Sequence, residues 1–347
     1  ASSGTGAVEA CLSSVIPPGK LVLIINNGAY GKRMEHICDA FGVPHIDYDI
    51  EWGQPIDIAC VQSRLNDLSD QISHIALVHH ETTVGILNSL QSITEMANEA
   101  NIQVIVDAMS SFGGIPIDLR TCKVDYLISS ANKCLQGMPG VSFVICHREA
   151  LLETKKFARR NFYFNLYDNF QFFQDQQQMQ FTPPVHILYA LRQAINEYFL
   201  EGEMERYRRY SESYECLIEG LEQMGFRFYV DKRHHSKLLT SVVEPEDEKY
   251  DFADMHQYLR KRGFTVYPGK SADKRMFRIA NIGEITKSDI KAFLGAFSGY
   301  LRERQIHVGY ANQSYEPTIV GGTFEPQSSS SGKKNLTSHR TTSGRML

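Results

Sequence analysis

The sequence lacks the features that would mark a membrane protein or a nucleic-acid-binding protein. No apolar run in its 347 residues approaches the roughly 20 residues that a membrane-spanning helix needs. Its 36 basic and 40 acidic residues nearly cancel to a net charge of −4, so there is no electrostatic footprint for nucleic acid or an anionic membrane. The balance favours a small neutral substrate surface or a localised pocket for an anion.

The cysteines exclude two further kinds of protein. There are seven, an odd number, and they are scattered without any C-x-x-C pair, which argues against a disulfide framework and against a zinc site. We therefore expect no metal and a reducing compartment, the cytoplasm first and the mitochondrion as the alternative. The chain starts at Ala1 without a methionine or a signal-peptide pattern, so we expect this start to be internal to a larger gene product.

Two pairs of adjacent histidines, His79-His80 and His234-His235, could suggest metal ligands. Neither pair has further donors at the spacing that a metal site needs, so we interpret all four as structural or solvated side chains. The candidate chemistry must come from other residues.

The first half of the chain alternates short apolar runs with helical patterns. Runs of this kind are typical of buried strands in a mostly parallel sheet that helices cover on both faces. The expected strands are 21–25, 75–78, 102–106, 124–128 and 141–145, and a helix is expected over 89–100. The fold class is therefore α/β, with the active site outside the carboxyl ends of the strands.

After Pro183-Pro184 the pattern changes, and we predict a second, smaller α+β domain. Its expected helices are 185–201 and 203–224, and its expected strands are 226–230, 237–243, 264–267 and 276–280. The predicted division is a large domain over 1–184, a small domain over 185–304, and a low-complexity, disordered tail over 305–347.

Unusual polar residues follow the expected strands. Asp107, Lys133, Thr82 and Tyr30 each come shortly after one of the apolar runs, so the strand-end rule brings them to one edge of the sheet. Each also has a structural alternative: the aspartate as a helix cap, the threonine as a turn former, the tyrosine as loop packing and the lysine as a solvated loop cation.

Together these residues suit a single cofactor. The glycine-rich turn at Ser3, Gly4 and Thr5 opens a helix expected over 7–16, and free N–H groups at a helix start hold phosphate. A buried carboxylate can keep a pyridine nitrogen protonated, and a lysine amine can form a Schiff base with an aldehyde. An aromatic ring can stack on the pyridine. These are the needs of pyridoxal phosphate.

Eight stretches resemble one known family. They are "SSGTGAVEA", "NNGAYGKRM", "HHETTVGILN", "VDAMSSFGGIPIDL", "DYLISSANKCLQGMPG", "FTPPVH", "YPGK" and "FRIANIGE". They resemble the 2-aminoethylphosphonate–pyruvate transaminases, a branch of the class V, fold-type-I aminotransferases, over about residues 1–303. The resemblance implies the pyridoxal-phosphate-dependent transferase fold and a homodimer.

The resemblance also implies roles around the cofactor ring. Lys133 matches the Schiff-base lysine, and Asp107 matches the partner of the pyridine nitrogen. Tyr30 matches the stacking aromatic residue, and Thr82 matches the residue that bonds near the phenolic oxygen.

Further roles concern the anionic groups of cofactor and substrate. Ser3, Gly4 and Thr5 match the phosphate cradle, and Thr182 matches a phosphate ligand that resembles those donated by a second subunit. Arg278 matches the arginine that grips the anionic group of the substrate, a role that suits its bidentate guanidinium. The alternative is a cation at a strand edge.

The implied activity is transfer of the amino group of 2-aminoethylphosphonate to pyruvate, giving phosphonoacetaldehyde and L-alanine. One alternative is an alanine–glyoxylate or serine–pyruvate type of aminotransferase. The other is a catalytically weak homologue that acts as a binding or regulatory protein. Family members carry a further stretch before the glycine-rich turn, so we expect either a fragment of a longer protein or a truncated relative with an open pocket.

Overall fold

A computed structural model of the chain describes residues 1–68, 70–269 and 275–309. Of the predicted tail over 305–347, residues 310–347 lie outside these ranges. Within the described part, Ile306 is buried in the C-terminal hydrophobic core. None of the helices within them combines the length and the apolar composition that crossing a membrane requires.

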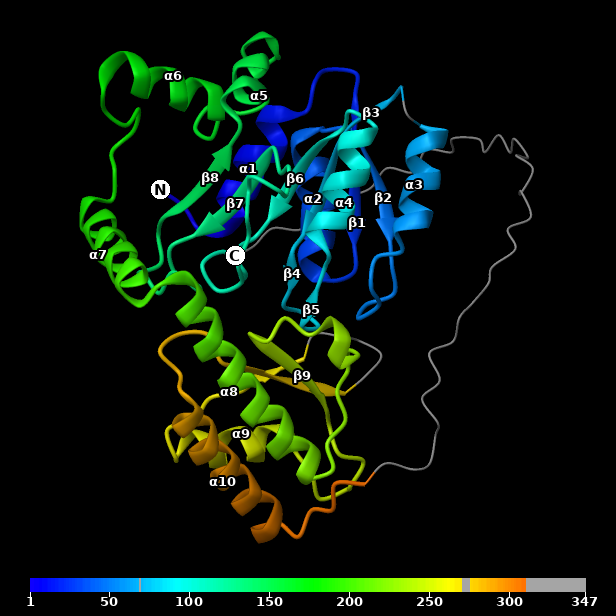
Figure 1. The fold of residues 1–347 in the computed structure, drawn as a ribbon, viewed down its shortest axis with the longest axis vertical. Coiled ribbons are helices and arrows are strands. Elements are labelled where there is room, and N and C mark those ends of the chain that lie inside the picture. The colour runs from blue at the N-terminus through cyan, green and yellow to red at the C-terminus, as the bar shows by residue number, and fades with distance from the viewer. Residues whose placement is uncertain (69, 270–274, 310–347) are drawn as a thin grey trace, which may run out of the picture. The chain divides into compact units, whose positions relative to one another are not determined.

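The N-terminal half is built on a six-stranded sheet with the order β2-β1-β3-β6-β7-β8 (Figure 1). Every neighbouring pair is parallel except β7 and β8, which are antiparallel. The strands are β1 Leu21–Asn26, β2 His45–Asp49, β3 Ile72–Val78, β6 Gln103–Asp107, β7 Tyr126–Ser130 and β8 Ser142–Cys146. The mostly parallel α/β sheet is therefore confirmed.

Helices cover both faces of this sheet because successive strand side chains point to opposite sides. In β1, Val22 and Ile24 belong to one core with α1 and α2, whereas Leu23 and Ile25 belong to another with α3 and α4. The helices of this half are α1 Gly4–Val15, α2 Ala29–Phe41, α3 Ile58–Asp67, α4 Leu90–Glu99, α5 Arg148–Glu153 and α6 Leu166–Gln176, and a 3-10 turn spans Thr154–Lys156.

A two-stranded hairpin follows β3 directly. It pairs β4 His80–Glu81 with β5 Ile86–Leu87, and Gly85 at its turn adopts a φ of 85°, a conformation that favours glycine. The hairpin carries the "HHETTVG" stretch past the end of the sheet.

The C-terminal half contains its own antiparallel sheet, with the order β10-β11-β9. Phe277 of β11 and Phe297 of α10 lie in its hydrophobic core, and neither side chain is exposed. The elements are α7 Val185–Glu201, α8 Glu203–Gln223, a 3-10 turn at Lys232–His234, β9 Leu239–Val243, α9 Phe252–Arg260, β10 Tyr267–Pro268, β11 Met276–Ala280 and α10 Lys287–Glu303. The predicted domain boundary at residue 184 stays a prediction.

Two expected strands are wrong. Of the strand expected over 264–267, only Tyr267 pairs, in β10. Phe264 and Val266 pack in the C-terminal core instead.

Residues 226–230 form no strand, and only Phe228 makes an isolated bridge, to Val242. The apolar residues there are buried in two different places. Phe226 packs in the C-terminal core, and Val230 packs in a separate small cluster. Burial in two clusters produced an apolar run without a continuous ladder of strand hydrogen bonds.

Candidate active site

A cavity of about 300 Å³ lies at the carboxyl ends of the central strands. It brings together six of the predicted site residues, namely Ser3, Gly4, Thr5, Tyr30, Asp107 and Lys133. Thr82, Thr182 and Arg278 do not line it.

The parallel pairing of β6 with β7 places the acid and the amine in the same cavity. Asp107 is the last residue of β6 and lies opposite Ile128 of β7. The chain leaves β7 at Ser130 and turns tightly, and the turn is closed by a 2.7 Å bond from the Gly137 N–H to the Ala131 carbonyl. Lys133 lies inside this turn and lines the cavity together with Asp107.

Asp107 is a buried carboxyl group with spare hydrogen-bonding capacity. Its side chain is 7% exposed, and its Oδ1 accepts a 2.8 Å bond from the Met109 N–H. The pKa of Asp107 is raised to about 6, chiefly by burial and to a smaller extent by the charge of Glu81, while the Met109 bond and the charges of Arg33 and Lys133 oppose the rise. No second donor from the described part of the chain reaches this carboxyl group, so Oδ2 is left for a ligand.

Glu81 positions Tyr30, and the sequence analysis missed it. The Glu81 carboxylate, which is 0% exposed, accepts 2.9 Å bonds from the N–H groups of Tyr30 and Thr83. It therefore lies at the positive end of α2, where a negative charge is favourable. A Cβ at Gly28 would come within 2.3 Å of Glu81, so only glycine fits before this helix. The signal was available, because the residue directly precedes the predicted Thr82.

The start of α1 presents free N–H groups to the cavity. Ser3 is the N-cap residue and makes no side-chain cap, and the N–H groups of Gly4 and Thr5 have no acceptor among the residues described. A Cβ at Gly4 would approach Met109 Sδ to 2.3 Å, so a larger residue there would displace the end of the Met109 side chain. The turn can therefore bind an anion through its backbone.

Arg33 and His80 also line the cavity, and the sequence analysis did not select either as a ligand. Arg33 lies three residues after Tyr30 on α2, a spacing that puts both on one helix face and could have identified it. The interpretation of the histidines as structural holds for His79, whose Nδ1 lies 2.9 Å from Ser111 Oγ. It also holds for His235, which lies 2.9 Å from Tyr214 Oη.

Arg278 and Thr82 contact each other outside the cavity lining. The Arg278 side chain is 9% exposed, and its Nη1 donates a 3.0 Å bond to the Thr82 carbonyl while its Nε donates one of 3.1 Å to Pro268. Burial lowers the pKa of Arg278 from its usual value. No carboxylate in the described ranges lies within ion-pair distance of this guanidinium, and the charge of Glu81 only partly offsets the effect of burial on its pKa.

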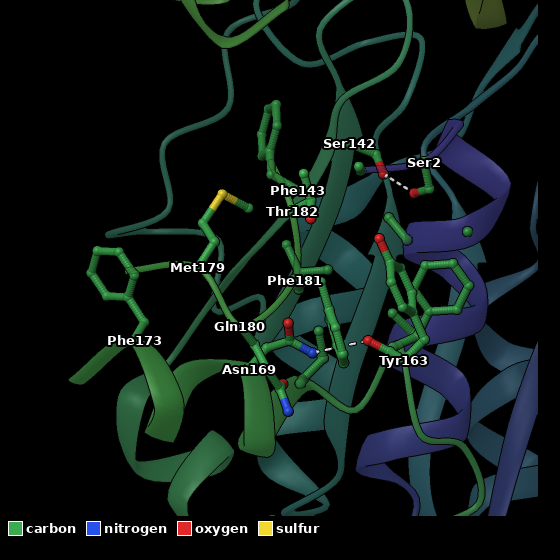
Figure 2. Close-up of a pocket in the computed structure, with 17 residues that line it drawn as sticks. Ser2, Ser142, Phe143, Tyr163, Asn169, Phe173, Met179, Gln180, Phe181 and Thr182 are labelled. Carbon is green, nitrogen blue, oxygen red and sulfur yellow. Dashed lines mark hydrogen bonds between the residues drawn. The ribbon is translucent and has the colours of Figure 1, made fainter. Parts of the chain in front are cut away.

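Thr182 lies in a second cavity, of about 260 Å³, that aromatic side chains surround (Figure 2). Ser2 lines this cavity and its Oγ lies 2.7 Å from Ser142 Oγ, whereas the neighbouring Ser3 lines the first cavity. Asn169 closes the lower part by donating a 3.1 Å bond to the Tyr163 carbonyl. Thr182 and Lys133 of one chain are therefore in separate cavities on the two sides of the α1 start.

Solved structures define the class of protein. An alanine–glyoxylate aminotransferase from Nostoc sp. superposes with a TM-score of 0.80 at 25% identity, covering 87% of this chain and 80% of that one. A pyridoxamine–pyruvate aminotransferase from Mesorhizobium loti superposes with a TM-score of 0.80 at 23% identity, covering 88% and 78%. The fold is that of the pyridoxal-phosphate-dependent transferases.

The sequence comparisons identify the family. Residues 1–293 match the family described as aminotransferase class-V. A 2-aminoethylphosphonate–pyruvate transaminase from Salmonella agona (strain SL483) is 42% identical over 297 residues, which are 85% of this chain and 80% of that protein. Its counterpart from Salmonella dublin has the same identity and coverage. The chain belongs to the class-V aminotransferases, as the resemblance predicted.

Members of this family use pyridoxal phosphate, and the residues of the first cavity fit that cofactor. Lys133 supplies a primary amine for its aldehyde, and the open Oδ2 of Asp107 supplies an acceptor for a protonated ring nitrogen. The unoccupied N–H groups of Gly4 and Thr5 supply donors for its phosphate. These groups therefore match the aldehyde, the ring nitrogen and the phosphate of the cofactor.

The burial of Asp107 predicts a pH-dependent stability effect. Because its folded pKa of about 6 exceeds its ordinary 3.8, the ionised group destabilises the cofactor-free protein fully above pH 6 and not at all below pH 3.8. Asp107→Asn should therefore raise the unfolding free energy at pH 8 by up to about 3 kcal/mol and leave it unchanged at about pH 3.5. Denaturant unfolding at both pH values measures this, and equal stability of the two proteins at pH 8 would contradict it.

Proposed function

We propose that the chain is a transaminase that moves the amino group of 2-aminoethylphosphonate to pyruvate, giving phosphonoacetaldehyde and L-alanine. The observation that carries the proposal is the meeting of Lys133 and Asp107 in one cavity of a chain that is 42% identical to transaminases of this name. The alanine–glyoxylate type of reaction is the second candidate, because a protein of that name shares the fold at 25% identity.

Pyridoxal phosphate, when bound, supplies an aldehyde that captures the amine and a ring that accepts electrons. The amine of Lys133 removes a proton from the substrate carbon next to nitrogen and later returns one. Asp107 keeps the ring nitrogen protonated, so stabilisation is greatest where negative charge develops. Tyr30 packs against the ring, and the start of α1 holds the phosphate. We assign Thr82 to the phenolic oxygen on the family resemblance. Thr82 lies outside the cavity lining, where its own carbonyl accepts the bond from Arg278.

Arg278 is proposed to bind the anionic group of the substrate. Its two bonds to carbonyl oxygens fix the guanidinium, and no carboxylate in the described ranges lies in ion-pair contact with it. Phosphonate and carboxylate both match the guanidinium fork. One arginine can therefore serve both the amino donor and pyruvate.

We further propose a homodimer in the cytoplasm, with the mitochondrion as the alternative compartment. Large apolar side chains are exposed on the stretch that contains Thr182, and they include Phe162, Phe173, Met179, Val185, Tyr189, Phe199, Leu200 and Met204. A second copy that covers them would bury apolar surface, and it could bring its Thr182 to the phosphate of the first. All seven cysteines are unpaired, which suits a reducing compartment.

Replacing Lys133 tests the covalent anchor. Lys133→Ala should abolish the visible absorption band that bound pyridoxal phosphate shows, and borohydride should no longer attach the cofactor to the peptide containing residue 133. Lys123→Ala is the matched control, because the Lys123 amine donates to Asn98 on the surface. Mass spectrometry after reduction locates the attachment. Cofactor attached covalently to the Lys133→Ala variant would place the anchor on another residue. A parent protein that binds the cofactor but transfers no amino group would favour the weak homologue.

Replacing Arg278 tests the substrate site. Arg278→Gln should lower the catalytic efficiency with 2-aminoethylphosphonate by roughly two orders of magnitude, the effect of losing a charge-assisted pair, with cofactor binding retained. Arg275→Gln is the control, since Arg275 is exposed and pairs with Glu244 at 2.9 Å. Steady-state kinetics with 2-aminoethylphosphonate and with alanine give the comparison. Unaltered kinetics for both donors would remove Arg278 from the site, and a preference for alanine and glyoxylate in the parent would favour the second candidate function.

A charged residue on the apolar stretch tests the dimer. Leu200 is 86% exposed, so Leu200→Glu should leave the fold intact in a monomer but weaken a dimer that buries this side chain. Analytical ultracentrifugation should show a dimer for the parent and a larger monomer fraction for the variant. A monomeric parent at micromolar concentration would contradict the proposal.

A further inference from the structure

Arg33 is a cation in the cofactor cavity that forms no ion pair within the described part of the chain. It is half-buried on α2, and its guanidinium carbon lies 4.7 Å from the centre of the Tyr30 ring. A partly buried guanidinium with no carboxylate partner is placed to bind an anion. Lys133 adds a second basic group to the cavity and Asp107 one acidic group, so the lining favours an anionic ligand.

The contact between Arg33 and Thr5 determines which way the threonine hydroxyl can donate. Arg33 Nη1 lies 3.0 Å from Thr5 Oγ1 and donates to it. A hydroxyl has one proton and two acceptor lone pairs, so this bond uses a lone pair and leaves the proton of Thr5 for another acceptor. No acceptor for that proton occurs among the residues that the structure describes. The Thr5 hydroxyl can therefore donate to a ligand, next to the free N–H groups of Gly4 and Thr5.

A second buried group shows that the same cavity is built for a polar ligand. His80 is 2% exposed and lines the cavity, and its Nδ1 lies 3.4 Å from the Ser110 carbonyl. Its Nε2 is buried without a hydrogen-bond partner in the described ranges. Buried polar atoms of this kind are normally satisfied, and a polar ligand in this cavity can supply the partner that His80 Nε2 lacks.

We propose that Arg33 is a positioning residue for the phosphate of the cofactor. It donates to Thr5 Oγ1, directs the hydroxyl proton of Thr5 to a phosphate oxygen at the start of α1, and supplies positive charge behind that bond. Its packing on Tyr30 links the phosphate end of the site to the residue placed against the ring. The inference rests on the proposed cofactor site. It gives Arg33 a role in phosphate binding in addition to that of the backbone N–H groups of Gly4 and Thr5.

The test compares two aldehydes that differ only in the phosphate. Dissociation constants of pyridoxal phosphate and of pyridoxal are measured by absorbance and fluorescence for the parent, Arg33→Gln, Thr5→Val and the double variant. Arg33→Gln should raise the dissociation constant of pyridoxal phosphate about tenfold or more beyond its effect on that of pyridoxal. This is the effect expected from losing a charge-assisted bond. In the Thr5→Val background, the same change should have a clearly smaller effect, because the hydroxyl that it orients is gone.

Arg120→Gln is the matched control, since it removes the same charge from a side chain that is exposed and paired with Asp118 at 2.9 Å. Thermal unfolding of each variant verifies the fold. Equal weakening of both aldehydes by Arg33→Gln would assign Arg33 to packing on Tyr30 and overturn the inference. Additive effects in the double variant would overturn it too. So would a change confined to the Michaelis constant for the phosphonate substrate, because that result would assign the guanidinium to the substrate.

These outcomes are separable from those that test the proposed function. A parent protein that binds pyridoxal phosphate but transfers no amino group would remove the proposed reaction and leave the role of Arg33 open to the same binding measurement. A parent that binds the phosphorylated and the unphosphorylated aldehyde equally well would overturn the inference while leaving amino transfer intact.

Discussion

The parallel alignment of β6 with β7 is the constraint on which the rest of the site depends. It puts the last residue of one strand, Asp107, beside the turn that carries Lys133. Two residues of opposite charge thereby meet in one cavity, where Asp107 is buried and Lys133 is partly buried. Both faces of the sheet are covered by helices, so this edge cannot move without disturbing two hydrophobic cores.

The site holds charge in places where charge is costly. Burial raises the pKa of Asp107 and of Glu81 and lowers that of Arg278, which shows that each charged form is disfavoured in the cofactor-free chain. Glu81 is compensated within the protein, by the N–H groups of Tyr30 and Gly31 at the start of α2 and by that of Thr83. Asp107 and Arg278 remain without a full partner at the places where a cofactor and an anionic substrate would bind. Ligand binding would therefore offset the free-energy cost of burying their charges.

The start of α1 separates two cavities with different surroundings. On one side, Ser3, Gly4 and Thr5 line the cavity of Lys133, and on the other, Ser2 lines the aromatic cavity of Thr182. One helix terminus thus connects the chemistry with the apolar stretch over residues 162–204. In the proposed homodimer, this shared terminus would couple oligomeric state to phosphate binding.

The sequence alone determined the parallel α/β sheet, the strand ends as the location of the site, and the grouping of Asp107, Lys133, Tyr30 and the glycine-rich turn. Those conclusions follow from local periodicity, from the strand-end rule and from motifs that extend over contiguous residues. Residues 226–230 were assigned wrongly because an apolar run does not reveal whether it packs as a ladder or into two separate clusters. Only the tertiary structure decided that Glu81 anchors Tyr30, that Arg33 donates to Thr5, and that Thr182 lies apart from Lys133. Those relations join residues on different elements, and their distances depend on how the helices pack against the sheet.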